Sequence, residues 1–166
     1  MKSRNQHTST VSLLTIIAKV AGPLKNIPFL PILLDEQMKL LTFFFRPKRF
    51  LKMQEFSRRV TEKLKLETGF HRFGGLEFRY RGKEIGHMHS NGLLDILFPR
   101  KLSSFLIEKG VTGIHHVYPD SGWTSLMIRG TTDIESCFAL MQYKLLLHTG
   151  KLKVEGIMKR FENVPI

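Results

Sequence analysis

The chain has 166 residues, enough for one domain with its own hydrophobic core. Its single cysteine, Cys137, excludes an intrachain disulfide, so we expect a reducing compartment, the cytoplasm. The net charge of +12 comes mainly from residues 1–65, where 13 Lys and Arg outnumber 4 Asp and Glu. A basic region of this kind is expected either to bind anionic lipid or nucleic acid phosphate, or only to keep the protein in solution.

Residues 1–49 are predicted to form a basic and hydrophobic arm. A helix is expected over residues 11–20, ended by Gly22 and Pro23. Lys19 interrupts the apolar run and no Ala-x-Ala pattern follows it, which argues against a signal peptide.

The segment 27–50 contains aromatic residues directly followed by Arg and Lys residues. Prolines and charges make it too broken to span a bilayer, which takes about 20 mostly apolar residues. Three phenylalanines run directly into Arg46, Lys48 and Arg49, the pattern of a peripheral segment at an anionic membrane surface. The alternative is an arm packed on the main domain or on a second subunit. Nucleic acid is the less expected partner, because few strands alternate aromatic and basic residues. The pattern predicts no particular oligomeric state.

Residues 50–150 are predicted to form one α+β domain. Residues 50–66 place apolar residues at helical spacing, and further helices are expected over 100–110 and 134–150. Period-two patterns between them indicate five strands, at 76–82, 84–89, 93–98, 113–119 and 123–130. Short turns make this five-stranded sheet mostly antiparallel, so we expect a two-layer sandwich with the helices on one face. Residues 151–166 are predicted to be a basic tail.

Two histidines, His87 and His89, lie one residue apart on the second of these strands. Residues two apart share a face of a strand, so both imidazoles should point the same way, together with Ile85. Glu84, Gly86 and Met88 should point the other way. The neighbouring strands add further candidate ligands or bases: Asp95, His115, His116 and Asp120.

Three interpretations of the histidine pair are open. In the first, His87 and His89 bind a metal ion together with a carboxylate, as in a two-histidine, one-carboxylate iron site. In the second, one imidazole is a catalytic base in a pocket. In the third, the rings are hydrogen-bonded at the sheet surface without chemistry. The only tryptophan, Trp123, is expected near His115 and His116, either as a core anchor or as a wall on which a flat aromatic ligand stacks.

One long stretch has a family resemblance. The strand "KEIGHMH", the next histidine-bearing strand and the segment "GWTSLMIRGTTDIESCFALMQYKLL" resemble the luciferase domain named after the light-emitting enzyme of bioluminescent fungi. The resemblance extends over residues 21–147 and is most specific in "EIGHMH" and "GWTS". The matching positions are Glu84, Ile85, His87, Met88, His89, a histidine at 115 or 116, Trp123, Thr124 and Tyr143.

The resemblance implies an activity. Fungal luciferases oxygenate a hydroxylated pyrone with O₂ and are thought to need no organic or metal cofactor, whereas many bacterial members have no known activity. By resemblance, this chain is a cofactor-independent oxygenase of a small enolic or polyphenolic molecule. A metal at His87 and His89 is the less expected variant.

The resemblance also implies roles for individual residues. His87 or His89, with Glu84 beside them, takes a proton from the substrate, and the other stabilises enolate and peroxide charge together with His115 or His116. The residues expected to contact the substrate are Trp123, Asp95, Asp120 and Tyr143.

Two features depart from the family pattern. The loop after the third strand is short, and a plain Asp-Ser-Gly turn precedes Trp123, so the pocket would have a different shape. Because a shared fold does not establish a shared reaction, a second class of function is kept. It is a non-catalytic binding module that uses the basic N-terminal half on an anionic membrane surface or on nucleic acid.

Overall fold

The protein is described by a computed structural model over residues 30–72 and 74–162. The helix expected at 11–20 lies outside these described residues. The elements follow one another as α2 (Leu30–Phe45), α3 (Pro47–Leu64), β1 (Glu67–Phe70), β2 (Leu76–Tyr80), β3 (Lys83–Met88), β4 (Leu93–Leu97), α4 (Arg100–Glu108), β5 (Gly113–Ile114), β6 (Trp123–Met127), α5 (Thr131–His148) and α6 (Val154–Phe161).

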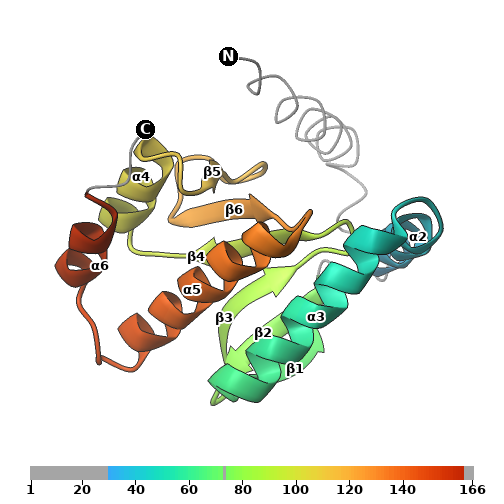
Figure 1. The fold of residues 1–166 in the computed structure, drawn as a ribbon, viewed down its shortest axis with the longest axis horizontal. Helices are drawn as coiled ribbons and strands as arrows, with labels where there is room; N and C mark the ends of the chain where they lie inside the picture. Colours follow the sequence, from blue (N-terminus) through green and yellow to red (C-terminus); the bar gives the residue numbers. More distant parts are fainter. Residues whose placement is uncertain (1–29, 73, 163–166) are drawn as a thin grey trace.

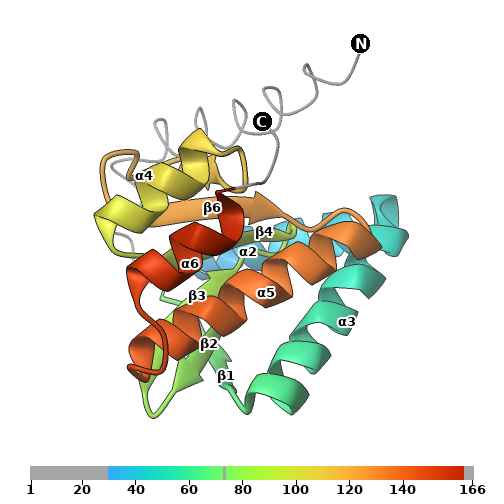
Figure 2. The same ribbon diagram turned by 60° about the vertical axis from the view of Figure 1, so that its left-hand side comes forward.

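The strands form one antiparallel sheet in the order β1-β2-β3-β4-β6-β5. Helix α5 runs across one face of this sheet and contacts β3, β4 and β6, with α3 beside it (Figure 1). Helix α6 packs against α4 at the β6 end, and Figure 2 shows α5 and α6 in front of the sheet. The α+β class and the antiparallel sheet predicted from the sequence are confirmed.

The core between the sheet and its helices follows the apolar periodicity of the sequence. Helix α3 buries Met53, Phe56, Val60 and Leu64, which recur at helical spacing. The Phe56 ring meets that of Phe78 on β2 edge to face, with centroids 5.8 Å apart. This contact joins the helical layer to the sheet that carries the histidines.

The sheet contains six strands in the described part of the chain, so the prediction of five is wrong. The missed strand is β1, an edge strand that pairs with β2 and has mostly exposed side chains, so it has no alternating pattern to reveal it. The strand predicted at 113–119 is also shorter, because β5 ends at Ile114. His115 turns the chain out of the sheet there, since its Nδ1 accepts hydrogen bonds from the backbone N–H groups of Val117 and Tyr118.

Two segments predicted to lie outside the domain pack against it. Helix α2 belongs to the predicted arm, yet it contacts α3, and its Asp35 accepts hydrogen bonds from Ser90 just beyond β3. Helix α6 belongs to the predicted tail, yet its Ile157 is fully buried in the core. The prediction that the helices share one face holds for α3 and α5, whereas α2 reaches the histidine face of the sheet through Asp35.

Candidate functional site

A β-bulge in β3 decides which side chains share the histidine face. Gly86 and Glu84 lie opposite consecutive residues of β2, so Ile85 between them has no partner. The bulge turns Ile85 into the core under the helices and brings Glu84 to the face of His87 and His89. The prediction that Ile85 shares the face of the histidines, and Glu84 the opposite face, is therefore wrong.

His87 is a buried ring between a carboxylate and a second imidazole. Its Nδ1 lies 2.6 Å from Glu84 Oε1, and the ring of His71 stacks on it with centroids 3.9 Å apart. Burial lowers the pKa of His87, but the carboxylates of Asp95 and Glu84 outweigh that effect, so its pKa lies above the usual value. The Glu84 contact fixes the orientation of the ring.

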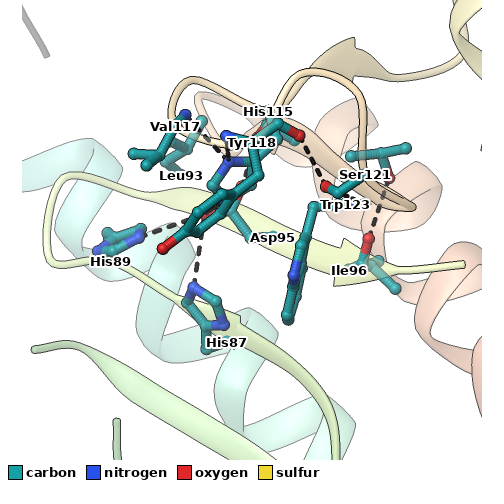
Figure 3. A network of polar contacts seen from close by, with 12 residues as sticks. His87, His89, Leu93, Asp95, Ile96, His115, Val117, Tyr118, Ser121 and Trp123 are labelled. Atoms are coloured by element: carbon teal, nitrogen blue, oxygen red, sulfur yellow. Dashed lines mark hydrogen bonds and ion pairs between the residues drawn. The ribbon is translucent and has the colours of Figure 1, made fainter. Parts of the chain in front are cut away.

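The centre of the cluster is Asp95, whose side chain is fully buried. It lies directly between His87 on β3 and Ser125 on β6, in one row across three strands. The Ser125 hydroxyl donates to its Oδ1. Its Oδ2 lies 3.2 Å from His89 Nε2, 3.5 Å from His87 Nε2 and 3.6 Å from His115 Nε2 (Figure 3). Burial raises the pKa of Asp95, but His87 and His89 outweigh this effect and keep the pKa far below its usual range, so the group is a carboxylate.

His89 lies between two carboxylates. Its Nε2 faces Asp95, and its Nδ1 lies 3.8 Å from Oδ1 of Asp35, which the backbone N–H and hydroxyl of Ser90 hold in place. Burial lowers the pKa of His89, yet the two carboxylates raise it to about 9. His89 is therefore an imidazolium at neutral pH.

Raising the pH should destabilise the protein through His89. The folded-state pKa of about 9 exceeds the ordinary 6.5, so the stabilisation is complete below pH 6.5 and is lost as the pH rises through 9. We expect the free energy of unfolding to fall by about 2 kcal/mol between pH 7 and pH 10. Urea unfolding in EDTA, which removes free metal ions, measures this fall. In the His89→Gln variant the fall should be smaller by that amount, and an unchanged fall would contradict the assignment.

The chain after β5 adds two more histidines to the cluster. His115 Nδ1 accepts two backbone N–H groups at 3.1 and 3.0 Å, so the ring proton sits on Nε2, which faces Asp95. Burial lowers the pKa of His115 to about 4, and burial lowers that of His116 as well, so both rings are neutral at pH 7. His116 stacks on His115 with centroids 4.7 Å apart.

Trp123 closes one side of the cluster. Its ring centroid lies 5.2 Å from that of His87 and 5.9 Å from that of His115, and the indole is half-buried. Figure 3 shows it beside Asp95 at the start of β6. The indole therefore forms an apolar wall next to the imidazoles.

Some residues predicted for the site lie elsewhere, and others were missed. Asp120 is exposed in the turn before β6. Tyr143 is on α5 in the helical layer, where its ring meets that of Phe161. The structure brings neither to the histidines. It adds Asp35 and His71, whose sequence surroundings hold no motif, so only the three-dimensional contacts reveal them.

A cavity adjoins the cluster at His89. Its volume is about 180 Å³, and it lies between α2, α3 and the ends of β2 and β3. Its lining combines apolar and polar residues: Phe50, Met53, Phe70, Leu76, Met88, Gly75, Asp35, Glu36, Lys39, Gln54, Ser57, His89 and Ser90. A larger hollow of about 360 Å³ lies near Cys137 and Arg129, and none of the clustered histidines lines it.

The fold and the cluster define a small antiparallel α+β domain with a buried histidine–carboxylate site. Residues 82–144 match the family model described as Luciferase domain. The predicted resemblance to the luciferase domain is therefore confirmed over these residues. The matched residues include the cluster from Glu84 to Trp123, whereas Asp35 and His71 lie outside them. No curated protein and no solved structure matches the chain.

Proposed function

We propose that the chain is an oxygenase that uses O₂ to oxidise a small enolic or polyphenolic molecule, without an organic cofactor. The observation that carries the proposal is the convergence of three imidazole nitrogens on buried Asp95, within a segment that matches the luciferase domain. The cavity beside His89 supports a substrate of one ring, since a cavity of about 150 Å³ accommodates benzene.

The reaction begins with removal of a proton from the enolic substrate. In the protein without a bound metal ion, we assign His87 as the acceptor, because Glu84 holds its Nδ1 and leaves Nε2 directed to the cluster. The resulting enolate gives one electron to O₂, and the substrate radical and superoxide combine to a carbon-bound peroxide. Both electrons of the new C–O bond come from these two partners, so no further oxidant is needed.

Two groups stabilise the negative charge that develops in these steps, and a third excludes water. The imidazolium of His89 offers a positive charge at the cavity, and the Nε2–H of His115 offers a fixed dipole. Trp123 keeps water from one side of the cluster. A preorganised site of this kind supports anion formation without movement of the protein.

Oxygen consumption tests the proposal. A 4-hydroxy-2-pyrone and a catechol, each added to the purified chain, should give O₂ uptake at an oxygen electrode. His87→Ala and His89→Ala should each lower the rate at least about 100-fold, the usual contribution of a general acid or base. The matched control is His148→Ala on the exposed end of α5, which should keep the wild-type rate. Wild-type uptake by both cluster variants would refute the assignment.

A second candidate function is binding to an anionic membrane surface through α2 and the start of α3. No helix within residues 30–72 and 74–162 is long and apolar enough to cross a bilayer. Large apolar side chains are nevertheless exposed there, with Phe44 at 70% and Phe45 at 77%. The others are Leu33, Leu34, Leu40, Leu41, Phe43 and Leu51. Arg46 and Lys48 are exposed next to them, while Arg49 is half-buried and donates to the backbone oxygen of Asn91.

Sedimentation with liposomes tests this second function. Replacement of Arg46, Lys48 and Arg49 by Ser should weaken binding to phosphatidylserine vesicles about 100-fold, at about 1 kcal/mol for each cation. The control replaces three exposed lysines of the C-terminal region, Lys151, Lys153 and Lys159, and changes the net charge equally. Equal losses in both variants would indicate a general charge effect and reject a specific surface.

A further inference from the structure

Three residues of the cluster place donor atoms at nearly the spacing of ligands around a small cation. His87 Nε2 and His89 Nε2 lie 3.5 and 3.2 Å from Asp95 Oδ2, and the three residues each place a ligand atom within 4.8 Å of the other two. Ligand atoms that sit about 2.1 Å from a divalent ion are about 3.0 to 3.4 Å apart at tetrahedral or octahedral angles. We infer that the cluster binds a divalent transition metal ion through these three atoms.

The outer nitrogens of both rings support this inference. A histidine ligand ordinarily directs its other ring nitrogen to a carboxylate or a carbonyl, which places the proton there and leaves the lone pair for the metal. His87 Nδ1 meets Glu84 at 2.6 Å, and His89 Nδ1 faces Asp35 at 3.8 Å. When a metal ion displaces the proton from Nε2 of His89, the Nε2 lone pairs of both rings are directed inward, to the side of Asp95.

The remaining contacts of Asp95 limit the ion to three protein ligands. Ser125 occupies Oδ1 and leaves Oδ2 facing the imidazoles. His115 Nε2 also lies 3.6 Å from Oδ2, but its Nδ1 accepts two backbone N–H groups, so its Nε2 carries the ring proton and offers no lone pair to an ion. Two histidines and one carboxylate leave coordination positions open, and this ligand set is typical of Fe(II) oxygenases.

The role of the metal ion in a reaction rests on the proposed oxygenase function. The test of metal binding does not depend on that function. With the ion bound, His87 and His89 act as its ligands and no longer accept the substrate proton. Enolic and catecholic oxygens are hard ligands that suit an Fe(II) or Mn(II) ion with open positions. A substrate that carries two such oxygen atoms would occupy the open positions of the ion.

Metal titration of the purified full chain tests the inference directly. After treatment with EDTA and its removal by dialysis, Fe(II) is added without oxygen and Co(II) in a parallel sample. Calorimetry should give one ion per chain, and Co(II) should give a visible absorption band that reports its ligands. His87→Ala, His89→Ala and Asp95→Ala should each weaken binding at least 100-fold, and His148→Ala should leave it unchanged.

Conservative variants keep the test informative if the alanine variants unfold. Glu84→Gln and Asp35→Asn leave the three ligands in place and should weaken binding 10- to 100-fold, the usual effect of changing a residue that orients a metal ligand. Circular dichroism of each variant confirms its fold. The inference would be overturned if the wild-type chain bound the metal ion no more tightly than the buffer does. It would also be overturned if Glu84→Gln, Asp35→Asn and Asp95→Ala all bound the ion as tightly as the wild-type chain.

The two proposals fail in different ways. If the EDTA-treated chain binds no ion yet consumes O₂ with a pyrone at the wild-type rate, the metal site is rejected and the metal-free oxygenase stands. If the chain binds one ion and consumes no O₂ with any enol or catechol, the metal site stands and the oxygenase is rejected.

Discussion

Replacement of Asp95 by Asn is expected to lower the free energy of unfolding by about 3 kcal/mol at pH 7 and to abolish oxygen uptake. The carboxylate is fully buried and is the counter-ion that His87 and His89 share. Removal of one partner of a buried ion pair leaves the other charge without compensation, which costs about 3 to 5 kcal/mol. Because the pKa of Asp95 lies far below its usual range, this contribution is fully present from pH 5 upward.

Urea unfolding at pH 7 measures the effect, and the chain provides a matched control. Asp120→Asn makes the same chemical change at an exposed turn and should alter the free energy of unfolding by less than about 0.5 kcal/mol. It should also leave oxygen uptake intact, since Asp120 lies outside the cluster. Equal effects of the two substitutions would show that Asp95 has no special electrostatic role.

Gly122→Ala should be the most damaging single-methyl change near the site. A Cβ at this position would clash with the carbonyl oxygen of Phe98, which belongs to the backbone and cannot move away by a change of rotamer. Gly122 also accepts the hydrogen bond from the Phe98 N–H at 2.9 Å, so β4 and β6 would have to separate here. We expect a loss of about 3 kcal/mol in the free energy of unfolding, as in an overpacked core.

The fluorescence of Trp123 reports this change, because the protein has no other tryptophan and the residue follows Gly122 directly. Its emission maximum should move to longer wavelength as the indole leaves the histidine cluster. Gly156→Ala provides the control, since Gly156 lies in α6 and its Cβ would meet only the movable side chain of Leu152, which precedes the helix. That substitution should stabilise the helix by about 0.5 to 1 kcal/mol and leave the emission maximum unchanged.

Local patterns predicted the elements whose burial is periodic. The apolar spacing of α3 matches the residues that it buries, and the alternating pattern over 76–82 indicated β2. On α5 only Ile134 and Met141 of the apolar spacing are buried, together with Cys137 and Leu140. The strand β1 has neither kind of pattern, because an edge strand with exposed side chains carries little selection for alternation. Its pairing with β2 became visible only in three dimensions.

The site could be predicted only as far as neighbouring strands determine it. The sequence indicated that His87, His89 and Asp95 lie close together, because side-chain spacing and strand order place them on adjacent strands. The position of Glu84 depends on the bulge at Ile85, which arises from pairing across strands and has no local signature. Asp35 lies 55 residues before Ser90 in the sequence, so no local pattern could indicate that the two residues are in contact.

The contact between Asp35 and Ser90 determines how this protein can be shortened. A truncated chain beginning at residue 50, the boundary that composition indicates, would leave His89 with one anionic neighbour instead of two. Its imidazole would lose its proton at lower pH, and titration curves measured on such a fragment would misrepresent the parent molecule. Expression of the isolated domain should therefore start no later than Leu30.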